Sequence, residues 1–136
     1  MSNGEPRPHP ADILSDRILD CAARVGKLVD AIPDTRLGRH IAAQLVRSGT
    51  SPVGNYEEAR SGESRRDFVH KLGICLKELR ESRGWIRLLI RTELLPLKKL
   101  QPLLDECEQL MNIIGRSIVT AKRAGMKEKP RRRPKT

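Results

Sequence analysis

The chain has 136 residues, long enough for one domain with a substantial core and too short for two. Aromatic residues make up only 2%, and the apolar content is mostly Leu, Ile, Val and Ala, which favours packed helices over a sheet. The formal net charge of +10 is typical of proteins that bind polyanions. No signal peptide and no long apolar run is present, so neither export nor membrane spanning is supported.

The N-terminal third of the chain predicts an unstructured lead and two helices. Residues 1–10 are rich in proline and lack core-forming residues, so we expect a disordered or extended lead. A first helix is predicted for residues 11–31, ended by Pro33 and Asp34. Thr35 is expected to cap a second helix. The core side of this second helix is predicted to contain Leu37, Ile41, Ala42 and Leu45.

The second helix contains a proline that disturbs its pattern. Pro52 cannot donate a hydrogen bond to residue 48 and disfavours helix at Ser51. We therefore expect a kink near Ser51-Pro52, or a break with Ser51 as a new N-cap. A restarted helix would expose amide donors, so a phosphate-cradling loop at residues 48–55 is an alternative to a simple bend. The spacing is not that of a P-loop, and the bend is the prediction we favour.

Residues 64–93 form the stretch around which the chain is organised. Apolar residues recur every three or four positions for about eight turns, or roughly 40 Å, which predicts a long amphipathic helix. Ser61 and Gly62 form the turn before it, and Glu63 and Ser64 lie near its start. Other helices must cover a stripe of this length. The residues of the stripe are Phe68, Leu72, Cys75, Leu76, Leu79, Ile86, Leu89 and Ile90.

The same long helix carries two further faces. One is basic and occupies a sector roughly 120° wide beside the apolar stripe; it contains Lys77, Arg80, Arg83, Arg87 and Arg91. The other is a smaller apolar face on the opposite flank, formed by Ile74, Trp85 and Leu88. The basic face is interpreted either as a solvated surface or as a binding face. Trp85 is interpreted either as extra core or, with its two neighbours, as an oligomer contact.

A last helix is expected to begin after Leu95-Pro96 and to end between Arg123 and Gly125. The fold class predicted is all-α, an antiparallel up-down-up-down four-helix bundle over residues 11–124. Residues 125–136 are read as a basic disordered tail, serving as a nucleic-acid tether or as a solubilising end.

Positive charge is concentrated in two regions, residues 35–92 and the tail. Because neutralised phosphates release counterions, such an arrangement favours binding of a polyanion. Contacts would be mainly to phosphates, since few aromatic residues are available to stack on bases. The predicted nucleic-acid-binding residues are Arg36, Arg39, Arg47, Lys77, Arg80, Arg83, Arg87, Arg91, Arg131, Arg132 and Arg133.

No constellation of catalytic or metal-binding residues is apparent. Cys21, Cys75 and Cys107 each fall on the apolar stripe of a predicted helix, so we expect reduced core residues in a cytoplasmic protein. His40 and His70 lie on different helices and lack the spacing of a metal site. We therefore predict no catalytic residue, no metal, no cofactor and no enzymatic activity.

Several short motifs together resemble a bacterial four-helix-bundle family first noticed in open reading frames inside intervening sequences of large-subunit ribosomal RNA genes. The resemblance spans roughly residues 12–123. It departs from the family at Pro52, where members often have an apolar residue. The motifs are Gln44-Leu45-Val46-Arg47-Ser48-Gly49-Thr50-Ser51, Asn55, Glu58-Ala59, Asp67-Phe68-Val69-His70-Lys71-Leu72, Leu76-Lys77-Glu78 and Trp85-Ile86-Arg87-Leu88-Leu89.

Members of this family are similar in fold to the accessory protein of diversity-generating retroelements, a pentameric bundle that binds a reverse transcriptase and RNA. The resemblance therefore implies a homo-oligomeric ring of five subunits with a positively charged surface, and it implies no reaction. Our leading hypothesis is a non-enzymatic RNA-binding assembly. The alternatives are a protein-interaction adaptor, such as a reverse transcriptase accessory subunit of a retroelement, and a scaffold without ligand.

Overall fold

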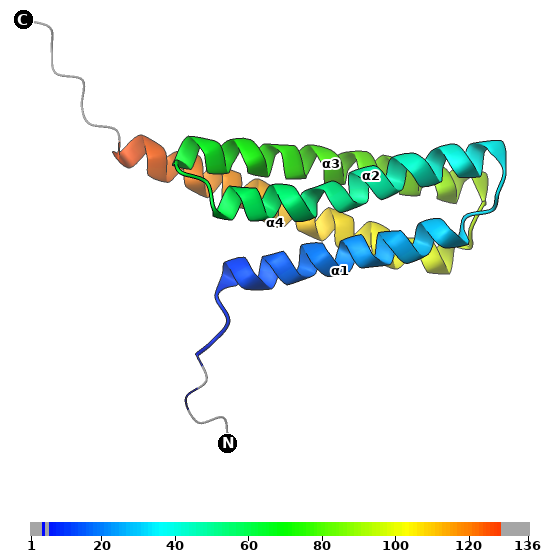
Figure 1. Cartoon of the computed structure of the whole chain (residues 1–136), viewed down its shortest axis with the longest axis horizontal. Helices are drawn as coiled ribbons and strands as arrows, with labels where there is room; N and C mark the ends of the chain where they lie inside the picture. The colour runs from blue at the N-terminus through cyan, green and yellow to red at the C-terminus, as the bar shows by residue number, and fades with distance from the viewer. Residues whose placement is uncertain (1–3, 5, 129–136) are drawn as a thin grey trace, which may run out of the picture.

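The computed structural model describes residue 4 and residues 6–128, and within them it contains four α-helices and no strand. The helices are α1 (Pro10–Ala31), α2 (Arg36–Arg60), α3 (Arg65–Thr92) and α4 (Leu97–Glu128). They run alternately up and down in chain order, and each packs along the next (Figure 1). The predicted all-α antiparallel bundle is therefore confirmed.

Side-chain caps fix the starts of the first three helices. Thr35 Oγ1 accepts a hydrogen bond from the amide of Gly38 at 2.9 Å, which confirms the predicted cap of α2. Ser64 Oγ accepts from the amide of Asp67 at 3.1 Å at the start of α3. α1 begins one residue earlier than predicted, because Pro10 fits the first turn of a helix and His9 caps it.

The core is built from one apolar seam of each helix. Burying a Leu or Ile side chain contributes roughly 1.5–3 kcal/mol, so these seams are the main source of stability. The fully buried aliphatic side chains are Val25, Ile41, Leu45, Leu72, Leu79, Ile86, Leu89, Leu100, Leu110 and Ile114. All three cysteines are also buried, as predicted.

α2 runs as one helix through Pro52, which is buried in its interior. The alternative of a break with Ser51 as a new N-cap is therefore wrong, and so is the phosphate-cradling loop at residues 48–55. Pro52 lacks the N–H that would bond to the carbonyl of Ser48, but the flanking turns are held by packing. One turn further on, Asn55 Nδ2 donates to the carbonyl of Ser51 at 3.0 Å and to its Oγ at 2.9 Å.

One residue of α2 that was predicted to lie in the core is exposed, so this prediction is wrong. Leu37 is 40% exposed, whereas its neighbour Gly38 is buried. The turn from α1 comes so close to Gly38 that an added Cβ would lie 2.0 Å from the carbonyl oxygen of Pro33. Gly38 must therefore face inward, and at about 100° per residue this turns Leu37 toward solvent.

α1 and α2 approach closely at a second glycine. A Cβ added to Gly49 would lie 2.7 Å from Cγ1 of Val25, which is fully buried. Only a residue without a side chain fits this crossing without displacing Val25. The motif around Ser48-Gly49 is thus explained by helix packing.

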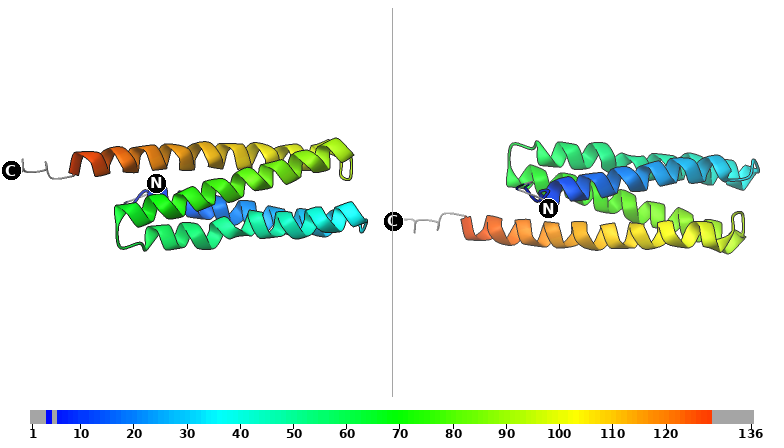
Figure 2. Two further views of the ribbon diagram at one scale, coloured as in Figure 1. Left: turned by 90° about the horizontal axis from the view of Figure 1, so that it is seen from above. Right: turned by 90° about the horizontal axis from the view of Figure 1, so that it is seen from below.

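α4 is longer than predicted. It continues through Gly125 to Glu128, so the predicted end between Arg123 and Gly125 is wrong and a tail that begins at residue 125 begins too early. The last turns lie against the start of α3, where a Cβ added to Gly125 would be 3.0 Å from Cδ of Arg65. The end of α4 projects beyond the other helices (Figure 2). The predicted tail residues Arg131, Arg132 and Arg133, and part of the lead, lie outside the described residues.

α1 and α4, the two helices most distant in sequence, close the bundle through a lighter contact than the other neighbours. Arg17 of α1 forms an ion pair with Glu106 of α4 and donates to Oε1 of Gln109 at 3.0 Å. Beside this pair, the sulfur atoms of Cys21 and Cys107 lie 4.0 Å apart in the core. The contact is therefore held by a few specific side chains.

Candidate nucleic-acid interface

Five basic side chains of α3 form one continuous row, which we call the α3 basic row. It consists of Lys77, Arg80, Arg83, Arg87 and Arg91. Arg83 is half-buried beside the core, and the other four are exposed. Among residues 6–126, whose side chains the structure describes, none of the five forms an ion pair with a carboxylate. Their charges are therefore uncompensated, and the row is a source of positive potential.

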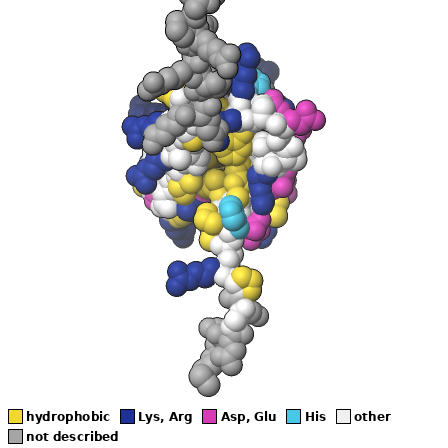
Figure 3. All heavy atoms as spheres, turned by 90° about the vertical axis from the view of Figure 1, so that its left-hand side faces the viewer, with side chains coloured by type: hydrophobic (Ala, Val, Ile, Leu, Met, Phe, Trp, Pro, Cys, Tyr) yellow, Lys and Arg dark blue, Asp and Glu magenta, His cyan; other side chains and the backbone are white. Residues whose placement is uncertain are grey.

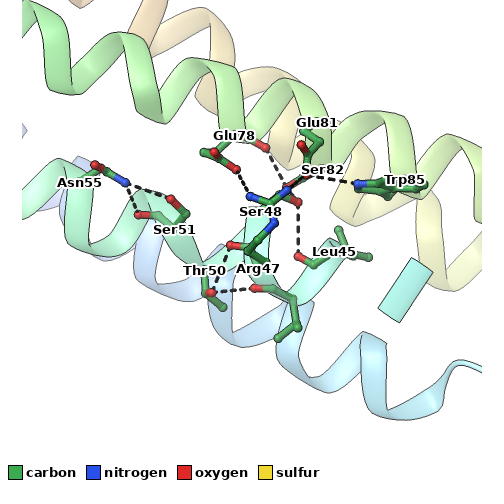
Figure 4. A network of polar contacts seen from close by, with 11 residues as sticks. Leu45, Arg47, Ser48, Thr50, Ser51, Asn55, Glu78, Glu81, Ser82 and Trp85 are labelled. Carbon is green, nitrogen blue, oxygen red and sulfur yellow. Dashed lines mark hydrogen bonds and ion pairs between the residues drawn. The ribbon is translucent and has the colours of Figure 1, made fainter. Parts of the chain in front are cut away.

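The predicted binding residues of α2 are placed differently. Arg47 forms ion pairs with both Glu78 and Glu81 of α3, at 3.0 Å to Oε2 of Glu78 (Figure 4). Arg39 forms an ion pair with Asp34 at 2.9 Å. Arg36 is exposed and has no carboxylate partner among the described residues. The structure thus separates Arg47 and Arg39, whose charges are compensated, from the α3 basic row.

Trp85 lies next to the ion pairs that Arg47 forms with Glu78 and Glu81. Its Nε1 donates to Oε2 of Glu81 at 3.3 Å (Figure 4). Its ring meets the ring of His40 edge-on with centroids 5.6 Å apart. Trp85 and Leu88 are half-buried and pack against the core, and Ile74 is half-buried about three turns before Trp85. Trp85 thus adds to the core, and a subunit contact through Ile74, Trp85 and Leu88 stays a prediction.

Lys71 extends the compensated side of α3 toward its start. Its Nζ donates to Oε2 of Glu58 on α2 at 2.6 Å. This hydrogen bond is the main reason why the pKa of Lys71 is raised, because it stabilises the ammonium form. Ion pairs between the two helices thus join this side of α3 to α2.

On the other side of α3, an open groove of about 700 Å³ runs between α3 and α4. We call it the α3–α4 groove. Its basic side chains are Arg80 of α3 and Arg116 and Arg123 of α4. The sequence analysis missed Arg116 and Arg123 as site residues. Their separation by seven residues places them on one face of α4, but the pairing of α4 with α3 was needed to see which face.

The rest of the α3–α4 groove is apolar or neutral. Leu76, Met111 and Val119 form apolar parts of its wall, and Asn112 and Thr120 add neutral polar groups. Gly115 also lines it, and an added Cβ there would meet no atom within 4 Å. No carboxylate lines this groove. The groove can therefore accept an anion without repulsion from its own walls.

A second basic cluster lies where the start of α3 meets the end of α4. Arg65, Arg66 and Lys122 line a pocket there together with apolar side chains, among them Val69 and Met126. Viewed from the end of the bundle that carries both termini, apolar side chains are visible at the centre, with Lys and Arg side chains near the margin (Figure 3). Basic side chains thus continue from the α3–α4 groove to this end.

The thiols and imidazoles form no reactive centre within the described part of the chain. Burial raises the pKa of Cys75 to about 11, which keeps it protonated at neutral pH. Among the described residues, no group of three His, Cys, Asp or Glu side chains is placed to hold a metal ion. In the same part of the chain, no helix is both long and apolar enough to cross a membrane.

Comparisons with known proteins agree with the four-helix fold. A family model described as 23S rRNA-intervening sequence protein matches residues 14–116. The fold is similar to that of a crystal structure from Bacteroides thetaiotaomicron VPI-5482, a protein with unknown function from the S23 ribosomal protein family. The TM-score is 0.74 at 30% identity, over 79% of this chain and 96% of that chain. No curated protein matches. Because the family model covers most of the bundle, the chain belongs to the 23S rRNA-intervening sequence protein family.

Proposed function

We propose that the protein is a non-enzymatic RNA-binding bundle of the cytoplasm, which holds RNA phosphates on the α3 basic row. The observation that carries the proposal is the lack of carboxylate partners for the row among the described residues. An arginine already paired with a carboxylate must give up that partner before it can hold a phosphate. The arginines of the row have no such cost, and the family name adds an association with ribosomal RNA.

The shape of α3 suits this role. The helix has no internal proline, and Arg80 and Arg91 are eleven residues apart, or about 16 Å along the axis. Guanidinium groups on such a rigid helix are held in a fixed row and offer bidentate hydrogen bonds to phosphate oxygens. Binding would release counterions and would therefore weaken steeply as salt is raised.

We extend the proposal to a homo-oligomer, a pentamer as the resemblance implies, with Ile74, Trp85 and Leu88 in the subunit contact. These side chains occupy one flank of α3 and are incompletely buried in the single chain. A ring would repeat the α3 basic row and convert weak contacts into avidity. Size-exclusion chromatography with light scattering, with and without RNA, tests this step. A monomer at micromolar concentration under both conditions would refute it.

The central experiment reverses the row. The variant R80E/R83E/R87E/R91E is expected to lose at least about 100-fold in RNA affinity by filter binding in 100 mM salt, because attraction becomes repulsion. Its helicity, measured by circular dichroism, should persist. Since Arg83 borders the core, the milder R80Q/R87Q/R91Q variant is measured in parallel.

A matched control changes the same amount of charge elsewhere. The variant R24E/K27E/K98E/K99E alters four exposed basic residues of α1 and α4. Its affinity should fall by no more than about 5-fold, because none of the four belongs to the α3 basic row and the attraction of exposed charges outside the contact is weakened by salt. Equal losses in both variants would mean that net charge alone attracts RNA, and the α3 basic row would have no special role.

The same titration addresses the adaptor alternative. If the purified wild-type protein binds no RNA even in 50 mM salt, the proposal is wrong. Binding that appears only when a reverse transcriptase is added would then support an accessory subunit of a retroelement. Binding by the protein alone, with a steep salt dependence, supports the RNA-binding bundle.

A further inference from the structure

The α3–α4 groove contains two neutral polar side chains beside its arginines. Asn112 and Thr120 are both exposed, and both line the groove next to its arginines. Neither side chain makes a hydrogen bond to another described residue. Each offers hydrogen-bonding atoms to a ligand without giving up an internal partner. Neutral donors and acceptors between cations fit a ligand that carries hydroxyl groups beside its anionic groups.

The α3–α4 groove has no aromatic side chain in its lining on which bases could stack. Tyr56 is only 4% exposed, and its hydroxyl donates to the carbonyl of Ala11. Phe68 packs against the core, and Trp85 is held by Glu81 and His40 on the opposite flank of α3. Proteins that bind single-stranded RNA generally stack unpaired bases on aromatic side chains. The groove is therefore poorly suited to single strands.

The charges of the groove suit a rigid, densely charged backbone. Arg116 and Arg123 lie two turns apart on α4, about 10 Å along its axis, and face the groove with Arg80 of α3. A double helix presents roughly one negative charge per 1.7 Å of axis, more than one strand alone. Fixed arginines on two rigid helices gain most from phosphates that are themselves fixed.

We propose that the α3–α4 groove binds the sugar–phosphate backbone of double-stranded RNA, with Arg80, Arg116 and Arg123 on phosphates and Asn112 and Thr120 on ribose 2′-hydroxyls. The proposal rests on the RNA-binding function proposed above. Leu76, Met111 and Val119 would lie against the sugars. Double-stranded RNA is recognised by shape and by contacts to phosphates and 2′-hydroxyls, so binding is expected to be insensitive to sequence.

Three probes of equal length test the ligand class by fluorescence anisotropy in 100 mM salt. They are a 20-base-pair RNA duplex, the DNA duplex of the same sequence and an unstructured single-stranded RNA. The RNA duplex is expected to bind at least about 5-fold more tightly than either other probe, because it alone combines the full charge density with 2′-hydroxyls. A scrambled RNA duplex should bind equally well. Equal or tighter binding of the single strand or of the DNA duplex overturns the proposal.

Substitutions of the neutral residues test their role separately. N112A/T120V keeps every charge, and it should lower the affinity for the RNA duplex about 5-fold while the affinity for the DNA duplex stays within about 2-fold. The RNA-to-DNA preference is the readout, and a general loss of folding would not change it selectively. Equal losses with both duplexes, or no loss with either, would contradict a contact to 2′-hydroxyls.

A glycine pair provides a steric test. G115L fills the groove without changing charge, whereas G26L adds the same side chain to α1, where an added Cβ likewise meets no atom within 4 Å. Both substitutions favour helix, so both variants should fold. G115L is expected to weaken binding of the RNA duplex about 10-fold through steric exclusion, and G26L should change it less than about 2-fold. Unaltered binding by G115L would show that the groove is not the site.

The two levels of the proposal fail in different ways. Absence of binding to all three probes in 50 mM salt would overturn the RNA-binding function together with this inference. Binding that prefers the single strand, or a 5-fold or greater loss of single-strand affinity in W85L at roughly unchanged stability, would overturn the inference alone. The latter result would show that Trp85 stacks on bases.

Discussion

The two flanks of α3 differ in how their charges are satisfied. On the flank that faces α2, Arg47 bridges Glu78 and Glu81, and Lys71 is bonded to Glu58. On the flank that borders α4, the α3 basic row has no such partner among the described residues. Within this part of the chain, one helix thus carries one face with paired charges and one face with unpaired basic side chains. The comparison teaches that the neighbouring helix, and not the number of basic residues, decides which arginines are available to a ligand.

Among the substitutions that compare the two flanks, the largest change in RNA affinity should come from placing carboxylates beside the α3 basic row. Gly73 and Gly84 lie within its sector, and a Cβ at either meets no atom within 4 Å. G73E/G84E places acids three or four residues from Lys77, Arg80 and Arg87, so RNA affinity should fall about 10- to 100-fold. Stability should rise by about 0.5 kcal/mol per site, because glycine is a poor helix former.

The neutral variant G73Q/G84Q is the control for that experiment. It gains the same helix propensity and adds no charge, so its RNA affinity should stay within about 2-fold of the wild type. Filter binding and thermal unfolding of both variants separate the two effects. If the glutamine variant lost as much RNA affinity as the glutamate variant, the loss would be due to the volume of the added side chains and not to their charge.

Substitutions of the buried serines at the flank of α3 that faces α2, which we call the α2 flank, should lower the stability of the fold and leave RNA binding unchanged. Ser48 and Ser82 are fully buried, with hydroxyl oxygens 2.8 Å apart, and Ser82 Oγ also donates to the carbonyl of Glu78. S82A leaves the Ser48 hydroxyl with only the carbonyl of Leu45, at 3.5 Å, as a partner and should cost about 1–2 kcal/mol in urea unfolding. Adding S48A should cost less than the sum of the single changes, because the two share one hydrogen bond. RNA affinity should not change.

Removing the acids of the α2 flank should make it resemble the other flank. E78Q/E81Q frees Arg47 and adds two units of positive charge, so RNA affinity should rise about 2- to 5-fold. The free energy of unfolding should fall by no more than about 1 kcal/mol, since such surface pairs contribute little. An unchanged RNA affinity would contradict the view that the ion pairs with Glu78 and Glu81 keep Arg47 from binding RNA.

The smallest effect is expected for Arg47 itself. R47Q should change RNA affinity less than about 2-fold, because this guanidinium is already engaged by two carboxylates. R80Q removes an uncompensated arginine of the same size and should reduce affinity about 3- to 10-fold. Filter binding of the two variants side by side compares the flanks one residue at a time. Equal losses would remove the distinction between them.

The helices and their faces were largely predictable because they depend on local periodicity. The stripe from Phe68 to Ile90, the Thr35 cap and the turn before Ser64 all follow from spacing and capping rules. The sequence favoured a bend at Pro52 and left a break as an alternative, and packing against α1 and α3, which outweighs the missing N–H, decides for one continuous helix. The inward Gly38 likewise depends on a contact with the preceding turn.

The binding face was only half predictable. Periodicity places Arg80 and Arg91 on one side of α3, but it does not reveal that Arg47 reaches Glu78 and Glu81 from another helix. The contribution of Arg116 and Arg123 depends on how α4 pairs with α3. Contacts between helices are set by register, which a single sequence specifies only weakly.

The order of the helices also bears on how the chain folds. Each helix packs chiefly on the one that follows it, and only the light contact between α1 and α4 joins the two ends of the sequence. Such a topology requires little closure of long loops, and helical bundles of this kind reach the native state in microseconds to milliseconds. During translation, α1, α2 and α3 can already form a mutually supporting layer, onto which α4 settles as it leaves the ribosome.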